Sequence, residues 1–518
     1  MHMTELSANT VPPELEQLFA RQAATALRLR QSSWQERTAK IRRLRDAVIA
    51  RTEAWYRAAQ ADFGKPAGEV DLAEILPVCL EANDAIRNLK RWMRPQRVRP
   101  TLLTLGTRSH VQYTPRGRCL IIGPFNYPVN LTLGPLVSAI AAGNTAIIKP
   151  SELTPHLSAL ISEVVREVFS PDEVAIFQGD AQLATELQKL PFDHVFFTGS
   201  PAIGKHVMAA AASHLASVTL ELGGKSPTIV DASADLRLAA RNIVWAKFAN
   251  AGQTCIAPDH VYVHESVKDA WVQCCRDELH KAFGQNDEQQ AQSPHLARIV
   301  NSRHASRLVA LLDDAKARGA QVLAGGQASA DSRYVQPTLL EAASADARIM
   351  QEEIFGPLLP VITYRSLDDV IGQINAAPKP LALYIYSRTP AHIRQVLARG
   401  GLHPVGALSL MILEDGPLFI ADTQVNPEPT PQQIMESVLG AARHVRRFGL
   451  VPKIALCTQS QFGNMDNDNA RRMREALELL DAREPDFAYE GEMNIDAALD
   501  QSLRDRLLPG SRYDGAAN

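Results

Sequence analysis

The chain has 518 residues, more than one hydrophobic core usually organises, so we expect roughly two to four domains. Hydrophobic residues make up 46% and charged residues 21% of the chain, as is ordinary for a globular enzyme. The formal net charge of -3 argues against a nucleic-acid-binding protein, which usually carries a basic excess. The N-terminus has no apolar signal core, and no apolar run approaches the roughly 18 residues of a membrane helix. The sequence therefore predicts a cytoplasmic protein without a nucleic-acid or membrane partner.

The six cysteines show neither the spacing of a disulfide framework nor an accompanying pattern of metal-ligating histidines. In a cytoplasmic chain such cysteines are expected to be reduced thiols. We therefore predict no disulfide and no metal site.

The spacing of apolar residues divides the chain into segments with different predicted secondary structure. Residues 13–94 have helical spacing, and residues 101–115 alternate as in an exposed strand or arm. From Arg118 onward, short apolar runs that end in Gly, Pro or Asn alternate with helical segments (CLIIG, NTAIIKP, VAIFQG, HVFFTG). This alternation predicts parallel β-α-β units in a doubly wound sheet, hence an α/β fold. Residues 225–399 repeat the alternation, as a second α/β domain would.

Two motifs follow buried strands of the first sheet. In RGRCLIIGPFNYPVN, Asn126 lies just beyond a strand, and its amide could donate to a developing oxyanion; a simple turn is an even alternative. In IIKPSE, Glu152 is placed to bind ribose hydroxyls, and Lys149 could do the same or meet a phosphate. A surface Lys/Glu pair is the alternative interpretation.

A third motif, FFTGSPAIGKHV, has Gly199 and Gly204 on either side of a strand-to-helix turn. Free amides and the helix dipole at such a turn favour a pyrophosphate. The spacing is not that of the dinucleotide-binding glycine motif, so this signal alone is weak.

Two further motifs suggest covalent chemistry. LELGGKSP contains Glu221 in an apolar strand, where partial burial would raise its pKa toward that of a base. NAGQTCIAP places Cys255 in a small, uncharged loop after a helix, where backbone amides could activate a thiol. Alone, Cys255 would more often be an inert buried cysteine, but an acid, an amide donor and a dinucleotide site accompany it. In EEIFGPLLPV, Glu353 could hold the nicotinamide ribose and Phe355 could pack against the nicotinamide ring; an ordinary strand entry is the alternative.

These motifs, in this order over about residues 14–399, resemble the aldehyde dehydrogenase superfamily, specifically its class-three type close to coniferyl aldehyde dehydrogenases. The resemblance implies oxidation of an aromatic or medium aliphatic aldehyde by NAD, with NADP also accepted. It implies that Cys255 attacks the aldehyde, Asn126 stabilises the oxyanion and Glu221 activates the hydrolytic water. It implies an NAD(P)-binding domain at 14–224 and a catalytic domain at 225–399. The cofactor residues it implies are Lys149, Glu152, Gly199, Ser200, Gly204, Leu222, Glu353 and Phe355.

After about residue 399 the family's closing strand, its Pro-Phe-Gly-Gly segment and its tail are not found. We therefore expect an unpaired sheet edge and a weakened homodimer. Residues 407–423 instead predict a hairpin around Asp415-Gly416, followed by helix, strand and helix.

The segment 401–518 resembles part of the phosphotransacetylase-like C-terminal domain of NADP-malic enzymes, carried by GPLFIADTQVNPEPT, ARHVRRFGLVPKIAL, SQFGN and PGSRYDGAAN. Ser460 and Gly463 precede a helix and could hold a phosphate, although a plain helix cap is favoured. The chain is thus predicted to join two partial proteins. The alternative to an aldehyde dehydrogenase is a catalytically impaired fusion whose last segment is an acyl-CoA-binding or regulatory module.

Overall fold

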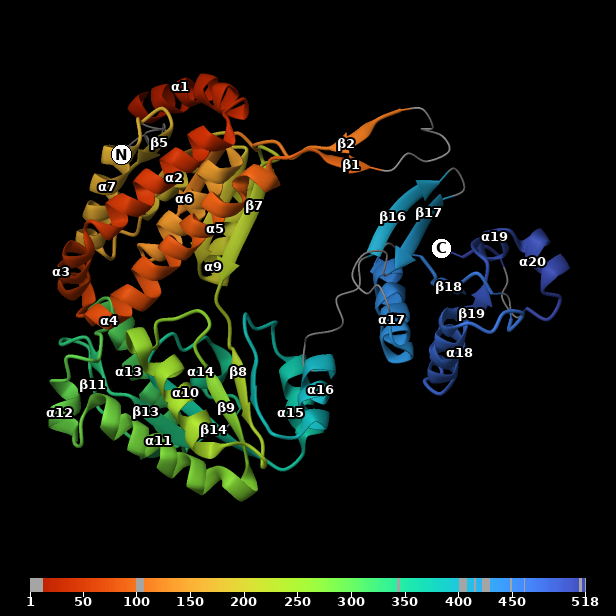
Figure 1. Ribbon diagram of the computed structural model, residues 1–518. Coiled ribbons are helices and arrows are strands. Elements are labelled where there is room, and N and C mark those ends of the chain that lie inside the picture. Colours follow the sequence, from red (N-terminus) through yellow and green to blue (C-terminus); the bar gives the residue numbers. More distant parts are fainter. Residues whose placement is uncertain are drawn as a thin grey trace, which may run out of the picture. The chain divides into compact units, whose positions relative to one another are not determined.

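The structure is a computed structural model that describes residues 13–98, 107–341, 345–399, 408–413, 416–421, 429–447, 450–460, 462–511 and 515–517. It divides into two compact units, Met1–Pro390 and Ala391–Asn518 (Figure 1). All six cysteines are free thiols. No helix in the described part of the chain is long and apolar enough to cross a membrane.

The first unit begins with the helices that the apolar spacing predicts. They end in a π-helical turn and a long helix, and an exposed two-stranded arm follows them (Figure 1). Of the predicted arm at 101–115, residues 101–106 lie outside the described residues, and Ser109–Val111 forms the second strand. The elements are α1 (Pro13–Arg30), α2 (Trp34–Ile49), α3 (Thr52–Phe63), α4 (Ala67–Val70), η1 (Asp71–Ile75), α5 (Leu76–Trp92), β1 (Gln96–Val98) and β2 (Ser109–Val111).

A five-stranded, fully parallel sheet follows, in the order β5-β4-β3-β6-β7. The chain starts at the central strand, winds outward in one direction and then crosses to the other side, which confirms the doubly wound α/β prediction. Its elements are β3 (Arg118–Ile122), α6 (Asn130–Ala142), β4 (Thr145–Lys149), α7 (Pro155–Val168), β5 (Val174–Ile176), α8 (Ala181–Leu187), β6 (His194–Gly199), α9 (Pro201–Ala212) and β7 (Ser217–Leu222).

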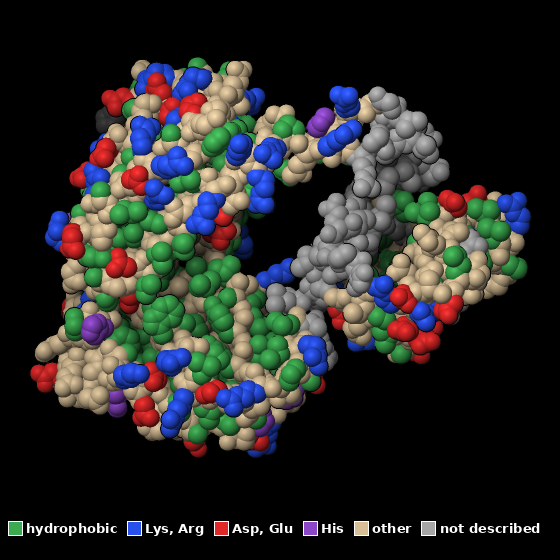
Figure 2. All heavy atoms as spheres, in the orientation of Figure 1, with side chains coloured by type: hydrophobic (Ala, Val, Ile, Leu, Met, Phe, Trp, Pro, Cys, Tyr) green, Lys and Arg blue, Asp and Glu red, His purple; other side chains and the backbone are tan. Residues whose placement is uncertain are grey.

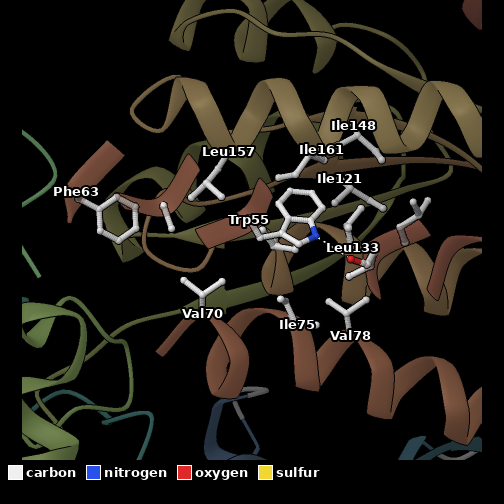
Figure 3. Close-up of a cluster of buried hydrophobic side chains, with 14 of the residues drawn as sticks. Trp55, Phe63, Val70, Ile75, Val78, Ile121, Leu133, Ile148, Leu157 and Ile161 are labelled. Atoms are coloured by element: carbon white, nitrogen blue, oxygen red, sulfur yellow. Dashed lines mark hydrogen bonds between the residues drawn. The ribbon is translucent and has the colours of Figure 1, made fainter. Parts of the chain in front are cut away.

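Both faces of this sheet are covered, because alternate side chains of its strands belong to different cores. Ile121 and Ile148 pack with α6, α7 and the N-terminal helices, whereas Leu120 and Phe197 pack with α1 and α9. Trp55 of α3 is fully buried in the first of these cores and donates its indole N–H to the Val48 carbonyl at 2.9 Å (Figure 3). The N-terminal helices are therefore an integral part of this domain.

A second, six-stranded sheet has the order β10-β13-β14-β9-β8-β15, with only β10 antiparallel. β10 and β15 lie at its two edges. Its strands are β8 (Pro227–Val230), β9 (His260–His264), β10 (Gln321–Ala324), β13 (Thr338–Glu341), β14 (Leu358–Tyr364) and β15 (Tyr384–Tyr386). The other elements of the first unit are α10 (Leu236–Phe248), η3 (Ala249–Gly252), η4 (Glu265–Val267), α11 (Lys268–Phe283), α12 (Asp287–Ala291), α13 (Ser302–Ala317), β11 (Ala328–Ser329), β12 (Tyr334–Val335), α14 (Arg348–Gln351) and α15 (Leu367–Ala376). The next helix, α16 (Pro390–Arg399), begins at the last residue of the first unit and otherwise belongs to the second.

The second unit contains the predicted hairpin, in which Leu413 pairs with Gly416, and the predicted helix-strand-helix order. Its elements are β16 (Leu408–Leu413), β17 (Gly416–Ala421), α17 (Pro431–Arg447), β18 (Lys453–Cys457), α18 (Asp468–Asp481), β19 (Ala488–Met493), α19 (Ile495–Leu499) and α20 (Gln501–Leu507).

The loop before α18 is neither the phosphate site nor the helix cap that the sequence suggested for Ser460 and Gly463. The helix is capped by Asn467, so the prediction of a cap at Ser460 is wrong. The Ser460 hydroxyl and the Gly463 N–H donate to the buried carboxylate of Glu492, at 2.7 and 2.9 Å, and Arg474 donates to the same oxygen at 2.8 Å. The donors expected to hold a phosphate therefore hold an internal anion.

Candidate active site

The predicted site residues of the first sheet lie where its parallel strands end. Lys149 ends β4, Gly199 ends β6, and Glu221 lies at the end of β7. Asn126 follows β3, so the loops after β3 and β6 meet at the position where the strand order reverses. Ligands of doubly wound sheets bind in the crevice at this position. Figure 2 shows hydrophobic side chains gathered around the middle of the first unit, between its two sheets, while charged side chains dominate farther out.

Cys255 follows a left-handed turn of unusual length. Asn250, Ala251 and Gly252 have φ values of 52°, 51° and 73°. Two of the three are not glycine, so this turn costs free energy unless its surroundings hold it. Gln253 supplies part of that hold, because its side-chain amide donates to the Asn250 and Arg298 carbonyls and accepts the Val300 N–H at 2.9 Å.

Asn126 is joined directly to the loop that leads to Cys255. Its side-chain amide donates to the carbonyl of Gln253 at 3.0 Å, and the residue is 4% exposed. Its own carbonyl accepts the Asn250 side-chain amide at 2.9 Å. Beside them, the Tyr127 hydroxyl lies 2.7 Å from the Thr254 hydroxyl. These bonds fix the amide donor and the thiol within one rigid arrangement.

The thiol of Cys255 is half-buried, and burial raises its pKa. The negative charges of Glu353 and Glu221 raise the pKa of the thiol as well. The N–H groups of Cys255 and Ile256 oppose them, as expected for amides that point toward a developing negative charge. Glu353 is held by the loop after β7, the strand that carries Glu221, and both carboxylates act on the pKa of the Cys255 thiol.

Glu221 is exposed, so the expected partial burial of this carboxylate is wrong. The reason is topological: β7 is the edge strand of the sheet, and it has a neighbour on one side only. A carboxylate there is reached by water. That accessibility suits a group that would activate a water molecule.

Glu353 and Phe355 follow α14, beside the two glycines after β7. The Glu353 carboxylate accepts the N–H of Gly224 at 3.0 Å, and burial raises its pKa. Phe355 adopts a φ of 47°, and its ring packs edge-to-face on Phe125, with ring centroids 5.8 Å apart. These two residues are thus held in contact with the elements that carry Glu221 and Asn126.

The remaining predicted cofactor residues lie at or just beyond the carboxyl ends of the strands of the first sheet. Lys149 is buried and forms an ion pair with the exposed carboxylate of Glu152. Ser200 caps α9 by accepting the N–H of Ile203. Gly204 faces Leu222, whose side chain would lie 2.8 Å from any β-carbon placed there. Gly204 therefore allows α9 to pack closely on β7.

The sequence did not single out three charged residues of the segment 65–74, namely Lys65 in the loop before α4, Glu69 in α4 and Glu74 in η1. The Lys65 ammonium, which is fully buried, donates to the Glu74 carboxylate at 2.7 Å and to the Asn126 carbonyl at 2.8 Å. Glu74 also accepts the N–H groups of Val129 and Asn130. Glu69 accepts the Asn250 N–H at 2.8 Å. Charges spaced four to nine residues apart on a helix resemble an ordinary solvated face, so the spacing alone could not have revealed them.

A substitution at Gly252 tests whether the backbone conformation of the loop before Cys255 is needed for activity. A β-carbon at Gly252 would lie 2.4 Å from the Gly356 backbone, so we expect Gly252→Ala to displace Cys255 and to lower the activity of the site by about a hundredfold. Steady-state turnover checks this. Gly319→Ala is the control, because Gly319 has a φ of 90° with nothing within 4 Å. Equal activities of the two variants would contradict the expectation.

Comparison with known proteins identifies the family to which the first unit is similar. The description "Aldehyde dehydrogenase family" matches residues 12–401, about three quarters of the chain. The chain belongs to the aldehyde dehydrogenase family. It is 43% identical over 361 residues to the 4,4'-diaponeurosporen-aldehyde dehydrogenase of Staphylococcus aureus, covering 70% of this chain and 77% of that protein. It is 40% identical over 388 residues to a Pseudomonas aeruginosa protein named "Probable coniferyl aldehyde dehydrogenase", covering 74% and 80%.

Among solved structures, the "Substrate bound state of Staphylococcus Aureus AldH" superposes with a TM-score of 0.71 at 41% identity, over 74% of this chain and 82% of that one. The resemblance to class-three and coniferyl aldehyde dehydrogenases is thereby confirmed. This chain is an NAD(P)-dependent aldehyde dehydrogenase. Its second segment, residues 386–518, matches the description "Phosphate acetyl/butaryl transferase".

Proposed function

We propose that this aldehyde dehydrogenase oxidises an aldehyde to its carboxylic acid through a thioester on Cys255. The observation that carries the proposal is the bond of 3.0 Å between the Asn126 amide and the Gln253 carbonyl, which fixes an amide donor beside the loop of the thiol. The charges of two carboxylates, Glu353 and Glu221, act on the pKa of the same thiol. A nucleophile, an oxyanion donor and a base are the groups that acyl transfer to water requires.

The residues present fit a dinucleotide. Ser200 begins α9 at the carboxyl edge of the sheet, directly after β6 and at the reversal of strand order, where a pyrophosphate would meet a helix N-terminus. Lys149 and Glu152 would hold the adenosine ribose, with Gly199, Gly204 and Leu222 beneath the phosphates. Glu353 and Phe355 would meet the nicotinamide riboside. The cofactor, when bound, accepts the hydride and supplies a positively charged ring that favours the thiolate.

The chain's own residues would act in two stages. In the first, the Cys255 thiol loses its proton to solvent and the sulfur bonds to the aldehyde carbon as the carbonyl π bond breaks; the new oxyanion is held by the Asn126 amide and the Cys255 N–H. Loss of hydride from that carbon leaves a thioester. In the second stage Glu221 takes a proton from water, whose oxygen attacks the thioester carbon and releases the acid and the thiol.

Glu221→Gln tests the second stage separately from the first. We expect one equivalent of NADH to form rapidly per active site, followed by steady turnover at least about a hundredfold slower than wild type, because only hydrolysis needs the base. Stopped-flow absorbance of NADH checks both phases. Glu163→Gln, a change at an exposed position of α7, is the control. Unaltered steady turnover in Glu221→Gln would rule out Glu221 as the base.

The finer assignments rest on the sequence and the class-three resemblance. We propose an aromatic or medium aliphatic aldehyde as substrate, a preference for NAD with NADP accepted, and a cytoplasmic enzyme. We propose a cofactor domain at 14–224, a catalytic domain at 225–399 and a separate segment at 401–518. The homodimer of the family would be weakened here, because β15 lies at the edge of its sheet.

A second candidate function belongs to the second unit. The match of residues 386–518 to acyl-phosphate transferases favours an acyl-CoA-binding or regulatory module. The full chain should then show a raised melting temperature with acetyl-CoA. Free acetate should leave the melting temperature unchanged, which controls for a nonspecific effect of the acetyl group's parent acid. A chain whose melting temperature ignores acetyl-CoA would count against this function.

A further inference from the structure

The left-handed turn before Cys255 requires support from outside the loop. Asn250 and Ala251 hold positive φ values without being glycine, and each such residue costs of the order of 1–3 kcal/mol. Such a conformation persists only where surrounding bonds determine it. The bonds of Gln253 and of the Asn250 side chain close the loop on itself and onto Asn126, but they leave its entrance from α10 to be fixed separately.

That entrance is held by Glu69. The Asn250 N–H, at the first residue of the left-handed turn, donates to the Glu69 carboxylate at 2.8 Å across 181 residues of sequence. Glu69 belongs to α4 and lies four residues after Lys65, which is in the loop between α3 and α4 and whose ammonium holds the Asn126 carbonyl. One short segment of the N-terminal helices therefore contacts both the loop of the thiol and the residue that donates to the oxyanion.

We propose that Glu69 is a positioning residue for the nucleophile: its carboxylate, by accepting the Asn250 N–H, fixes the turn that aims the Cys255 thiol. This inference rests on the proposed role of Cys255. It assigns Glu69 no contact with the aldehyde or the cofactor. Replacing Glu69 is therefore expected to slow the chemical step and to leave the affinity for the substrate nearly unchanged.

The environment of Glu69 supports this assignment. Burial raises the pKa of its carboxyl to about 7, against the opposing effects of Lys65 and the Asn250 N–H. A carboxyl so placed is costly for folding, so its presence calls for a reason other than stability. Either protonation state keeps an oxygen that accepts the Asn250 N–H.

The experiment compares Glu69→Met, which removes the acceptor at similar volume, with Glu69→Gln, which keeps a carbonyl oxygen. Glu53→Met, at an exposed glutamate of α3, is the matched control. Deuterium exchange of the peptide covering residues 249–256 reports the turn, and steady-state kinetics with NAD+ and an aromatic aldehyde report the chemistry. All measurements use the full chain.

We expect Glu69→Met to speed exchange in this peptide and to lower kcat about 10- to 100-fold, with KM for the aldehyde changed less than about threefold. Glu69→Gln should restore kcat to within about threefold of wild type. Unchanged exchange, or a kcat for Glu69→Met equal to that of Glu53→Met, would overturn the proposal, as would a Gln variant as slow as the Met variant. If wild type forms no NADH, the proposed function fails, whereas the exchange result still decides the role of Glu69 in the turn.

Discussion

Cys255→Ser should abolish measurable oxidation of aldehydes, with a loss of about a thousandfold or more. The serine hydroxyl keeps nearly the same shape, but at neutral pH it is a far weaker nucleophile than a thiol. An alcohol ionises far less readily than a thiol, so serine at this position supplies almost no anionic nucleophile. Production of NADH from NAD+ and an aromatic aldehyde measures the effect.

The matched control is Cys274→Ser, at a half-buried thiol on α11. It should retain wild-type turnover, and both variants should bind NAD+ as wild type does in a fluorescence titration. Equal NADH production by wild type and Cys255→Ser would remove Cys255 as the nucleophile. A variant that loses NAD+ binding together with turnover would point to a damaged fold.

Lys65→Met should lower the free energy of unfolding of the first unit by about 3–5 kcal/mol. Lys65 and Glu74 are both fully buried, so removal of the ammonium leaves a carboxylate inside the protein without its counter-charge. The N–H groups of Val129 and Asn130 remain bonded to that carboxylate, which keeps the loss within this range. Urea unfolding followed through tryptophan fluorescence checks it, because Trp55 lies in the same domain core.

The second variant in this series is Lys65→Met/Glu74→Gln, which removes both charges. We expect it to recover at least about 1 kcal/mol relative to Lys65→Met, because the uncompensated charge is gone. Lys268→Met is the control, since Lys268 and Glu341 form a partly exposed pair, and exposed pairs contribute about 1 kcal/mol or less. If Lys65→Met and Lys268→Met cost the same, burial does not decide the strength of the first pair.

The sequence was sufficient for those features that depend on local pattern. Every apolar run proposed as a strand between Arg118 and Gly199 became one, because parallel strands buried on both faces need continuous apolar residues. The loop of Cys255 was also recognisable from local pattern. The small residues of NAGQTC are what a turn of three positive φ angles and a close approach of two backbones require.

What the sequence did not predict depends on pairing across the fold. The exposure of Glu221 follows from the edge position of β7, which no local pattern records. The roles of Lys65 and Glu69 depend on contacts made 61 and 181 residues away. The donors at Ser460 and Gly463 were taken for a phosphate site because Glu492, which occupies them, lies about thirty residues further along the chain.

The close approach of Gly252 to Gly356 has a consequence for engineering. A β-carbon at Gly252 would meet the Gly356 backbone, so Gly252 cannot accept a side chain while the segment of Gly356 stays in place; one at Gly356 would meet the end of the Leu308 side chain. The segments that carry Cys255 and Glu353 are therefore not independent modules for mutagenesis. A library aimed at new aldehydes should randomise positions outside both glycines, or vary Gly252, Gly356 and Leu308 together.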